Sequence, residues 1–537
     1  MGLWQRLFNR NKKSDLKGFH LSDSLVISQR EGRLKEKLSV DLKSNLTAIR
    51  DLYGTSSDLS IRHFKAGPEQ VQGAIVNIEG LVAKHYLENI LEVVQIDSLK
   101  TRIEPSHQPD FYQVIKERLL TALDIKEIST FDKLCENLAS GHAMLFINGV
   151  DQAICCGAEG WEKRAVEEPA AEASIRGPRE GFTESIRTNT AMIRRRLKTP
   201  NLWIESLSIG KLTRTQVAFA YVKGLTSDKL VAEVRSRLQR IDIDAVLESG
   251  YIEEFIEDTP FTLFPLMART ERPDWVSASL LEGKVAIFTD GTPFVLLAPI
   301  TFIELLQAPD DYYERVPIAI LIRNLRIIAY WGSIFLPGVY VAVTGFHHEL
   351  LPSELVLRIA SSRQGVPFPV MVEVFIMQLA FEMLREAGIR LPRAIGSAIS
   401  IVGALILGEA AIRAGLVSPA VIIIVALTAI ASFTVPAFNL GQTSRLLLFL
   451  FIILGGTIGL FGIQLGLLLL LVHLCTLRSF GTPYFMPIGP MVFTDWRDAF
   501  IRTWWWNMLH RPHLVGSREM DREKPGQMPR PEPRRRE

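Results

Sequence analysis

Two stretches of the chain follow one pattern: AIVNIEGLVAKHYLENIL at 74–91 and AFAYVKGLTSDKLVAEVR at 218–235. Each has an apolar strand, a Gly-Leu turn, and then apolar residues at helical spacing. A second pair, LASGHAMLFINGV at 138–150 and LLEGKVAIFTDGT at 280–292, repeats the relation. Gly80 aligns with Gly224 and Gly149 with Gly291, at offsets of 144 and 142. Two matches at nearly one offset predict two related α/β subdomains, at 45–165 and 210–316, whose turn glycines take positive φ.

Two segments of this soluble half are basic. Residues 1–44 have no apolar signal segment, so we expect them to stay with the α/β region in the cytoplasm. Between the copies, 166–209 is expected to be a separate basic connecting segment with a helix over about 183–197. Six arginines lie in this segment: Arg176, Arg179, Arg187, Arg194, Arg195 and Arg196. They favour either a docking surface for a partner or another subunit, or a solvated helix paired with neighbouring glutamates.

The second half is apolar enough to cross a membrane. Between Ala394 and Thr476 only Glu409, Arg413 and Arg445 carry formal charge, which excludes a fully soluble enzyme. We therefore predict an α-helical multi-pass membrane domain at 317–490. Its four expected spans are 327–346, 394–412, 416–435 and 446–474. Pro367–Leu384 carries two glutamates and is expected to be an interfacial or re-entrant helix.

Lys/Arg bias sets the expected orientation. The segment 491–537 is predicted to be an amphipathic and then disordered cytoplasmic tail, with tryptophans 504–506 as an interface anchor. With both termini inside, the number of spans must be even, and four fits. In that arrangement Arg385, Arg390 and Arg393 lie outside, against the same rule. A six-span arrangement that also counts Lys284–Leu306 and Pro367–Leu384 places them outside too and needs two poorer spans.

The second predicted span contains small and polar residues. Gly396, Gly403 and Gly408 are candidates for close helix packing in lipid. Glu409 is ionisable at membrane depth, which by default indicates function and commonly an ion pathway. The alternative is that Glu409 pairs with Arg413, one turn further along the helix.

Several classes of function lack support in the sequence. A net charge of +2 argues against nucleic acid as the main partner. Four cysteines are too few for a disulfide scaffold, and their spacing does not match a zinc site. No phosphate loop, dinucleotide fingerprint or catalytic constellation is recognisable. We therefore predict no enzyme activity, no catalytic residues, no metal and no cofactor.

Nine motifs resemble those of the A subunits of bacterial spore germinant receptors, the GerA family. The likeness covers about residues 40–490. The motifs are RGPREGF (176–182), RTNTAMIRRRL (187–197), TERPDW (270–275), DGTPFVLLAP (290–299), DDYYER (310–315), PGVYVA (337–342), SRQGVPFP (362–369), EMLREAGIRLP (382–392) and SFGTPYFMP (479–487).

The resemblance implies a membrane protein of the spore inner membrane. Its expected partners are a transporter-like, nutrient-binding B subunit, a lipoprotein C subunit, further copies of itself and membrane lipid. Such A subunits are thought to form a ring, a pentamer, around a nutrient-gated cation channel. The family offers no catalytic residues.

Under that expectation the second predicted span could line the pore. The pore-lining candidates are Ser397, Ser400, Ala404 and Glu409, because a ring of carboxylates favours cations. Ser397 and Glu409 do not share a helix face, so at most one of them need face the axis. The candidates for subunit contact or coupling are Arg176, Arg179, Arg194, Arg195, Arg196, Glu271 and Arg272.

Three alternatives remain at this point. A secondary transporter would show inverted repeats among its membrane segments, and none is visible. A membrane-bound enzyme would need a catalytic constellation. A scaffold that recruits the nutrient-binding subunit and conducts nothing is the alternative that the sequence separates least from a channel.

Overall fold

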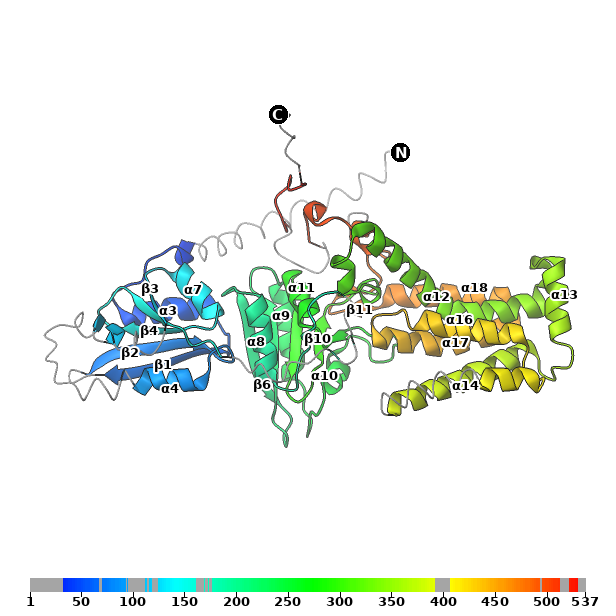
Figure 1. Cartoon of the computed structure of the whole chain (residues 1–537), viewed down its shortest axis with the longest axis horizontal. Coiled ribbons are helices and arrows are strands. Elements are labelled where there is room, and N and C mark those ends of the chain that lie inside the picture. The colour runs from blue at the N-terminus through cyan, green and yellow to red at the C-terminus, as the bar shows by residue number, and fades with distance from the viewer. Residues whose placement is uncertain are drawn as a thin grey trace, which may run out of the picture.

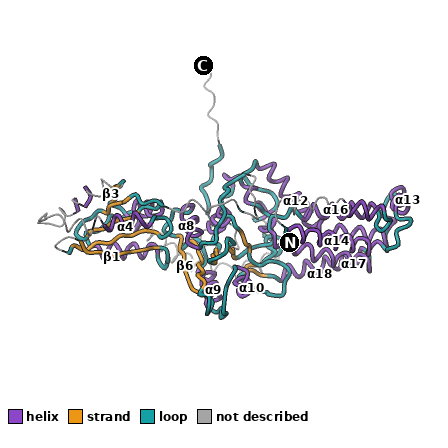
Figure 2. Tube along the Cα trace, turned by 60° about the horizontal axis from the view of Figure 1, so that its bottom comes forward, coloured by secondary structure: helices purple, strands orange, loops and turns teal. Residues whose placement is uncertain are grey.

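The computed structural model places two α/β subdomains and a helix bundle in a row (Figure 1). It describes residues 32–66, 70–92, 94, 112–113, 115–117, 124–160, 169, 172, 176–391, 406–492, 495–511 and 521–529. The strands lie toward one end of the molecule and the long helices toward the other (Figure 2). The expected fold class, two related α/β subdomains followed by a helical region, is confirmed.

The first subdomain is a five-stranded antiparallel sheet with helices packed on it. Its strand order is β1-β2-β4-β5-β3. The chain runs through α3 (Leu42–Tyr53), β1 (Leu59–Ala66), β2 (Val71–Ile78), α4 (Lys84–Glu92), β3 (Ile125–Ile128), α7 (Phe131–Ala139), β4 (Ala143–Ile147) and β5 (Ala153–Cys156). All five residues of β4 are buried because helices cover both faces of this central strand.

The second subdomain repeats this arrangement, with the strand order β6-β7-β9-β10-β8. Its elements are α8 (Ile186–Arg196), β6 (Leu202–Ile209), β7 (Thr215–Val222), α9 (Asp228–Gln239), α10 (Ser249–Ile256), β8 (Ala268–Thr270), α11 (Pro273–Leu281), β9 (Val285–Thr289) and β10 (Val295–Ala298). The turn glycines of the repeat have positive φ as predicted: 84° at Gly80, 92° at Gly149, 95° at Gly224 and 90° at Gly291.

The position of α8 corrects one expectation. We predicted a separate connecting segment over 166–209, but α8 precedes β6 just as α3 precedes β1. Met192, Ile193 and Leu197 are buried in the same core as residues of β7 and β9. The helix is therefore the first element of the second subdomain. Its arginines concealed this, because they suggested a solvated helix although its other face is apolar.

The helical region follows two short 3-10 turns, η2 (Glu304–Leu306) and η3 (Pro309–Tyr312). It comprises α12 (Val316–Phe346), η4 (His348–Leu350), α13 (Ser353–Ser362), α14 (Val370–Arg390), α16 (Pro419–Ser432), α17 (Phe438–Ile458) and α18 (Leu460–Thr476). Of the described helices, α12 and α17 are long and apolar enough to cross a membrane. α16 and α18 are shorter apolar helices beside them.

The run 446–474, predicted as one span, is two helices. Gly459 ends α17 and begins α18 with φ 71°, a conformation that glycine adopts without steric cost. Gly462 and Gly466 lie against Leu454 and Phe451 of α17, so the two helices are antiparallel. The chain reverses at this glycine, which explains why the apolar run is longer than one span requires.

α14 also differs from the expectation of an interfacial or re-entrant helix at Pro367–Leu384. Its start lies against the end of α17, where a Cβ on Gly456 would meet Met371. Its end lies near the start of α17 and the end of α16, through Glu382 and Arg385. α14 therefore runs along the bundle, antiparallel to α17 (Figure 1). Its glutamates are accommodated because arginines inside the bundle pair with them.

α12 begins eleven residues before the predicted span 327–346. At about 1.5 Å per residue its 31 residues span about 46 Å, more than the apolar layer of a bilayer requires. The additional turns contain Arg323 and Arg326, whose side chains are buried against residues from outside the bundle. After the bundle come β11 (Arg478–Ser479), β12 (Thr482–Pro483), α19 (Trp496–Ala499) and the 3-10 turn η5 (Trp505–Asn507).

Candidate functional site

A cluster of charged side chains joins the second α/β subdomain to the first turns of α12. Arg272 is the N-cap residue of α11 and is followed by Pro273, whose fixed φ suits the first helical position. Its guanidinium pairs with Asp274 at 2.7 Å and with Asp310 at 3.0 Å. Tyr313 donates to Asp274 at 2.8 Å. The motifs TERPDW and DDYYER, far apart in the sequence, are thus in direct contact.

Asp274 is ionised at neutral pH despite its burial. Burial alone would raise the pKa of this carboxyl group, but the hydrogen bonds from Arg272 and Tyr313 outweigh burial and lower the pKa. The contact between the two motifs is therefore a charge-assisted one in a largely dry environment. Removing Arg272 would leave the buried Asp274 charge without its cationic partner, and removing Asp274 would leave the buried Arg272 with Asp310 alone.

A second ion cluster lies directly beside the first, between η3 and α12. Asp311 is buried and accepts from Arg323 at 3.2 Å and from Arg326 at 3.0 Å. Arg326 also donates to the carbonyl oxygen of Leu306 at 2.9 Å. Two buried cations face one carboxylate here, so a second anion is needed to balance the charge.

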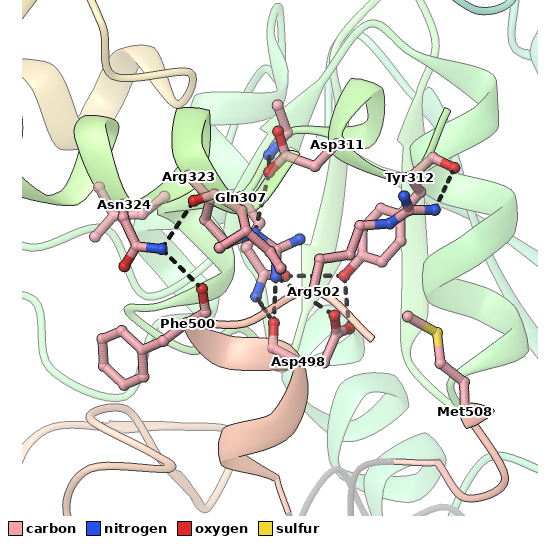
Figure 3. A network of polar contacts seen from close by, with 12 residues as sticks. Gln307, Asp311, Tyr312, Arg323, Asn324, Asp498, Phe500, Arg502 and Met508 are labelled. Carbon is pink, nitrogen blue, oxygen red and sulfur yellow. Dashed lines mark hydrogen bonds and ion pairs between the residues drawn. The ribbon is translucent and has the colours of Figure 1, made fainter. Parts of the chain in front are cut away.

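The tail supplies that anion. Asp498 of α19 lies 3.4 Å from Arg323, and its other carboxylate oxygen accepts from Tyr312 at 2.7 Å (Figure 3). Arg323 also donates to the backbone carbonyl of Asp498. Burial raises the pKa of Asp498, although Arg323 and Tyr312 oppose this shift. The C-terminal segment is therefore a structural part of the junction.

Further polar contacts hold the tail across the start of α12. Arg502 donates to the carbonyl oxygens of Glu314 at 2.6 Å and Tyr312 at 3.0 Å. Asn324 donates to the carbonyl oxygen of Phe500 at 3.3 Å, and Gln307 to that of Asp498 at 2.9 Å. Figure 3 shows these side chains converging from η2, η3, α12 and the tail. We call this set of contacts the junction network.

A cavity of about 990 Å³ adjoins the junction network between α11, η2 and the tail. Trp275, Tyr312 and Met508 contribute to its walls. Lys284, 2% exposed, lies at its edge and pairs with Glu304 at 2.6 Å. Buried charges at this edge are thus paired within the chain.

Arg194, a predicted subunit-contact or coupling residue, lies between the two α/β subdomains. Its side chain is 1% exposed and binds Asp58 through two nitrogens, at 2.7 and 3.0 Å. It also donates to Ser56 at 2.7 Å. Asp58 precedes β1, so Arg194 links the second subdomain to the first within one chain. A fully buried side chain of this kind is unavailable to another subunit in this conformation.

The other coupling candidates are distributed over the same half of the molecule. Arg195 and Arg196 pair with Glu180 at 3.2 and 2.9 Å, in agreement with the solvated-helix alternative for these two residues. Arg176 is more exposed and lies 3.7 Å from Glu314, near the junction network. Glu271 is buried, and its carbonyl oxygen accepts from Phe182 at 2.8 Å. Arg179 directly precedes Glu180, the residue with which Arg195 and Arg196 pair.

Most of the pore-lining and helix-packing candidates lie outside the described residues: Gly396, Ser397, Ser400, Gly403 and Ala404. Glu409 is described, exposed, and paired with Arg413 at 2.5 Å, which is the alternative weighed for it above. A Cβ on Gly408 would meet Ile422 of α16 at 3.5 Å. Gly408 therefore lies next to a neighbouring helix.

The sequence analysis missed two ion clusters inside the bundle. Glu373 of α14 is fully buried, pairs with Arg363 at 3.0 Å and accepts from the backbone N–H of Ser418 at 3.1 Å. Nearer the α/β region, Arg385 donates to Ser432 at 2.8 Å and lies 3.5 Å from Glu382. The spacing of Glu382 and Arg385, three residues apart in an apolar helix, was the available signal.

Comparison with known proteins identifies the family. The chain matches the family model described as Bacillus/Clostridium GerA spore germination protein over residues 47–514. It is 46% identical to spore germination protein KA of Bacillus subtilis over 508 residues, covering 94% of this chain and 92% of that protein. It is 39% identical to spore germination protein GerLA of Bacillus cereus, covering 88% and 94%.

Two further similarities concern a membrane protein and a solved N-terminal domain. An uncharacterized membrane protein of Bacillus subtilis, YfkQ, is 44% identical over 91% of this chain and 94% of its own length. The crystal structure of the N-terminal domain of the A subunit of the Bacillus megaterium spore germinant receptor GerK3 is 39% identical, with a TM-score of 0.39. The match covers 50% of this chain and 99% of the crystallised chain. The chain therefore belongs to the GerA family of spore germination proteins, as an A-subunit family member.

Proposed function

We propose that this protein is the A subunit of a nutrient-sensing germinant receptor and that five copies enclose a nutrient-gated cation channel. The channel would lie in the spore inner membrane and start germination by releasing cations, without catalysis. Its partners would be the B subunit, which binds the nutrient, and the lipoprotein C subunit. The observation that carries the proposal is α12, which holds the junction network at one end and packs along α16, α17 and α18.

We further propose six membrane crossings in place of the four expected from the sequence. α17 begins beside the second subdomain, where Thr443 donates to the carbonyl oxygen of Leu263, and ends beside the end of α12, where Gly459 meets His347. α14, α16 and α18 alternate with α12 and α17 in direction. With residues 394–412 as a further crossing, both termini lie on the side of the α/β subdomains.

Six crossings would agree better with the Lys/Arg bias than four, although Arg358 on α13 would remain outside. Arg385 and Arg390 would then lie on the cytoplasmic side, where the four-span arrangement placed them outside. The test is reactivity of single cysteines toward a membrane-impermeant maleimide in inverted and right-side-out vesicles. Arg390→Cys should react in inverted vesicles and Arg358→Cys, on α13, in right-side-out ones. Reaction of both from one side would rule out this topology.

The channel itself is tested by potassium release from spores given nutrient. We compare wild type with Ser400→Phe and Ala404→Phe, and with the matched change Ala426→Phe at an exposed position of α16. Block of release, or release without nutrient, in the first two variants alone would support a pore at 394–412, provided that immunoblots show normal subunit levels. Normal release in all variants would favour the scaffold.

We propose that the junction network couples the cytoplasmic region to the bundle. Asp311→Asn keeps the shape of this side chain but removes the charge that Arg323 and Arg326 share. The matched control is Asp51→Asn, because Asp51 pairs with Arg33 at 2.8 Å with both side chains about half exposed. Nutrient-dependent potassium release should be lost or become constitutive in the first variant only. An equal effect of both changes would argue against a coupling role.

A further inference from the structure

The loop between α10 and β8 presents an aromatic side chain that the fold does not bury. Phe261 is 98% exposed, and Leu263, two residues later, is 51% exposed. Phe264, the next residue, is 2% exposed and belongs to the core. Single exposed apolar residues are common on protein surfaces, so exposure alone assigns no role to Phe261. The position of Phe261 relative to the bundle indicates a role.

The residues beside Phe261 are fixed to the ends of two bundle helices. Thr262 lies 3.0 Å from the imidazole Nε2 of His473, near the end of α18. The carbonyl oxygen of Leu263 accepts from Thr443, in the second turn of α17. Asp258, at the start of the loop, accepts from the backbone N–H of Gly481 at 3.2 Å. The loop is therefore held at a defined depth along α17 and α18.

At that depth the two helices expose apolar side chains. Phe438 and Leu446 of α17 are 49% and 59% exposed, and Val472 of α18 is 56% exposed. Thr443 is five residues into α17, about 7.5 Å along its axis. Phe261 is thus level with side chains that face outward from the apolar part of the bundle.

We propose that Phe261 and Leu263 insert into the membrane leaflet on the side of the α/β subdomains, so that the loop anchors the second subdomain to lipid. This inference rests on the proposed membrane crossing of α17 and α18. The occupant is lipid because the loop is fixed to α17 and α18 at a depth where outward side chains of both helices are apolar. An aromatic side chain at the boundary between headgroups and acyl chains is a common interfacial anchor.

The charges around the loop set the depth of insertion. Glu253 and Glu254 on α10, and Glu257 just after it, would be costly in acyl chains, so α10 itself stays among the headgroups or above them. Two basic side chains lie in the same region. Arg237 pairs with Asp258 at 2.5 Å, and Arg269 lies over the ring of Phe438. Only the loop tip therefore enters the apolar layer.

The test is depth-dependent fluorescence quenching in the full-length chain reconstituted into phosphatidylcholine–phosphatidylglycerol vesicles. The background is Cys475→Ser, because Cys475 is the exposed cysteine and Cys135, Cys155 and Cys156 are buried. An environment-sensitive dye is attached to Phe261→Cys. Two reference variants carry the same dye: Leu446→Cys on the outer face of α17, and Leu212→Cys in the β6–β7 turn, where the wild-type leucine is 82% exposed.

The expected result is quenching at 261 by lipids spin-labelled near the headgroup, within roughly twofold of that at 446, and weak quenching by aqueous iodide. The dye at 212 should show the reverse. Strong iodide quenching at 261 would overturn the inference. So would shielding from both quenchers, which would mean that another protein chain covers the loop. If 446 is also inaccessible to lipid, the proposed membrane crossing of α17 fails first.

Discussion

The helix that follows the third strand begins differently in the two α/β subdomains. In the first subdomain α7 begins with Phe131 after Thr130, and Asp132 in its first turn is exposed. In the second, α11 begins with Pro273 after Arg272, and Asp274 at the equivalent position is buried in the ion cluster at the start of α12. The same helix start is thus exposed to solvent at Asp132 in the first copy and contacts the residues before α12 in the second.

The comparison shows which residues of the repeat differ at this helix start. The five-strand order is the same in both copies, so the fold does not depend on the residues that differ. The copy next to the bundle carries an arginine and a proline where the other has threonine and phenylalanine. The side chains that differ at this helix start contact the residues that lead into α12.

The largest expected effect separates these two equivalent aspartates. Asp274→Ala leaves Arg272 buried without its bidentate partner and should lower the free energy of unfolding by about 3–5 kcal/mol. Asp132→Ala removes a favourable interaction with a helix start and should cost about 0.3–1 kcal/mol. Thermal unfolding of the purified full-length chain in detergent measures both. Similar costs would show that the two positions are equivalent in energy as well as in fold.

The next effect concerns the contact between the two copies. Arg194→Ala removes a buried guanidinium and leaves Asp58, which is 10% exposed, without its partner. We expect a loss of about 2–4 kcal/mol, smaller than for Asp274 because water can reach Asp58. Limited proteolysis should then show the two subdomains separating before either unfolds. Cooperative loss of both at once would mean that other contacts hold them together.

A pH effect should arise in the second copy. Burial, with repulsion from Glu257, raises the pKa of Glu253 to about 7, above the value near 4.5 of an unperturbed glutamate. The folded state then holds the proton more tightly than the unfolded state. Protonated Glu253 therefore contributes on the order of 1–3 kcal/mol to the free energy of unfolding. This stabilisation is fully present below about pH 4.5 and is lost as the pH rises through 7. Glu253→Gln should flatten that part of the stability–pH curve; an unchanged slope would assign it to other groups.

The smallest effect compares two turn glycines of the repeat. Gly80→Ala and Gly291→Ala both force alanine into positive φ, which costs about 1–2 kcal/mol. A Cβ at Gly80 would also lie 3.2 Å from the carbonyl oxygen of Arg187, whereas nothing lies within 4 Å of one at Gly291. Chemical denaturation should therefore find Gly80→Ala the more destabilised. The reverse order would mean that the two copies are not packed closely at Gly80.

The sequence predicted the elements with clear local patterns. Both repeated pairs, 74–91 with 218–235 and 138–150 with 280–292, have an apolar period and turn glycines, so the two α/β subdomains and the positive φ at four glycines followed from them. The nine motifs were also sufficient to indicate the GerA family. Strand order could not be predicted, because antiparallel pairing between distant strands leaves no local signal.

The junction network lay beyond reach of the sequence for a similar reason. Asp311, Arg323 and Asp498 come from three separate segments, and an arginine in an apolar helix suggests a span boundary rather than a buried ion pair. Hydropathy likewise could not show that Gly459 reverses the chain, because the residues on both sides of it are equally apolar. Packing and chain direction, which decide these features, are properties of the folded molecule.

Pro337 and Gly338 form a point in α12 at which the helix could bend. Pro337 has no N–H to donate to the carbonyl oxygen of Ser333, and Gly338 lies directly against the backbone of α17 at Phe451 and Gly455. The helix thus has a pivot, with an arm of 21 residues, about 32 Å, on the junction side. A rotation of about 5° there moves Val316 by about 3 Å, comparable to the length of a hydrogen bond. Small angular changes there would therefore be enough to make or break the ion pairs at the start of α12, and spin-label distances between α12 and α17 would detect them.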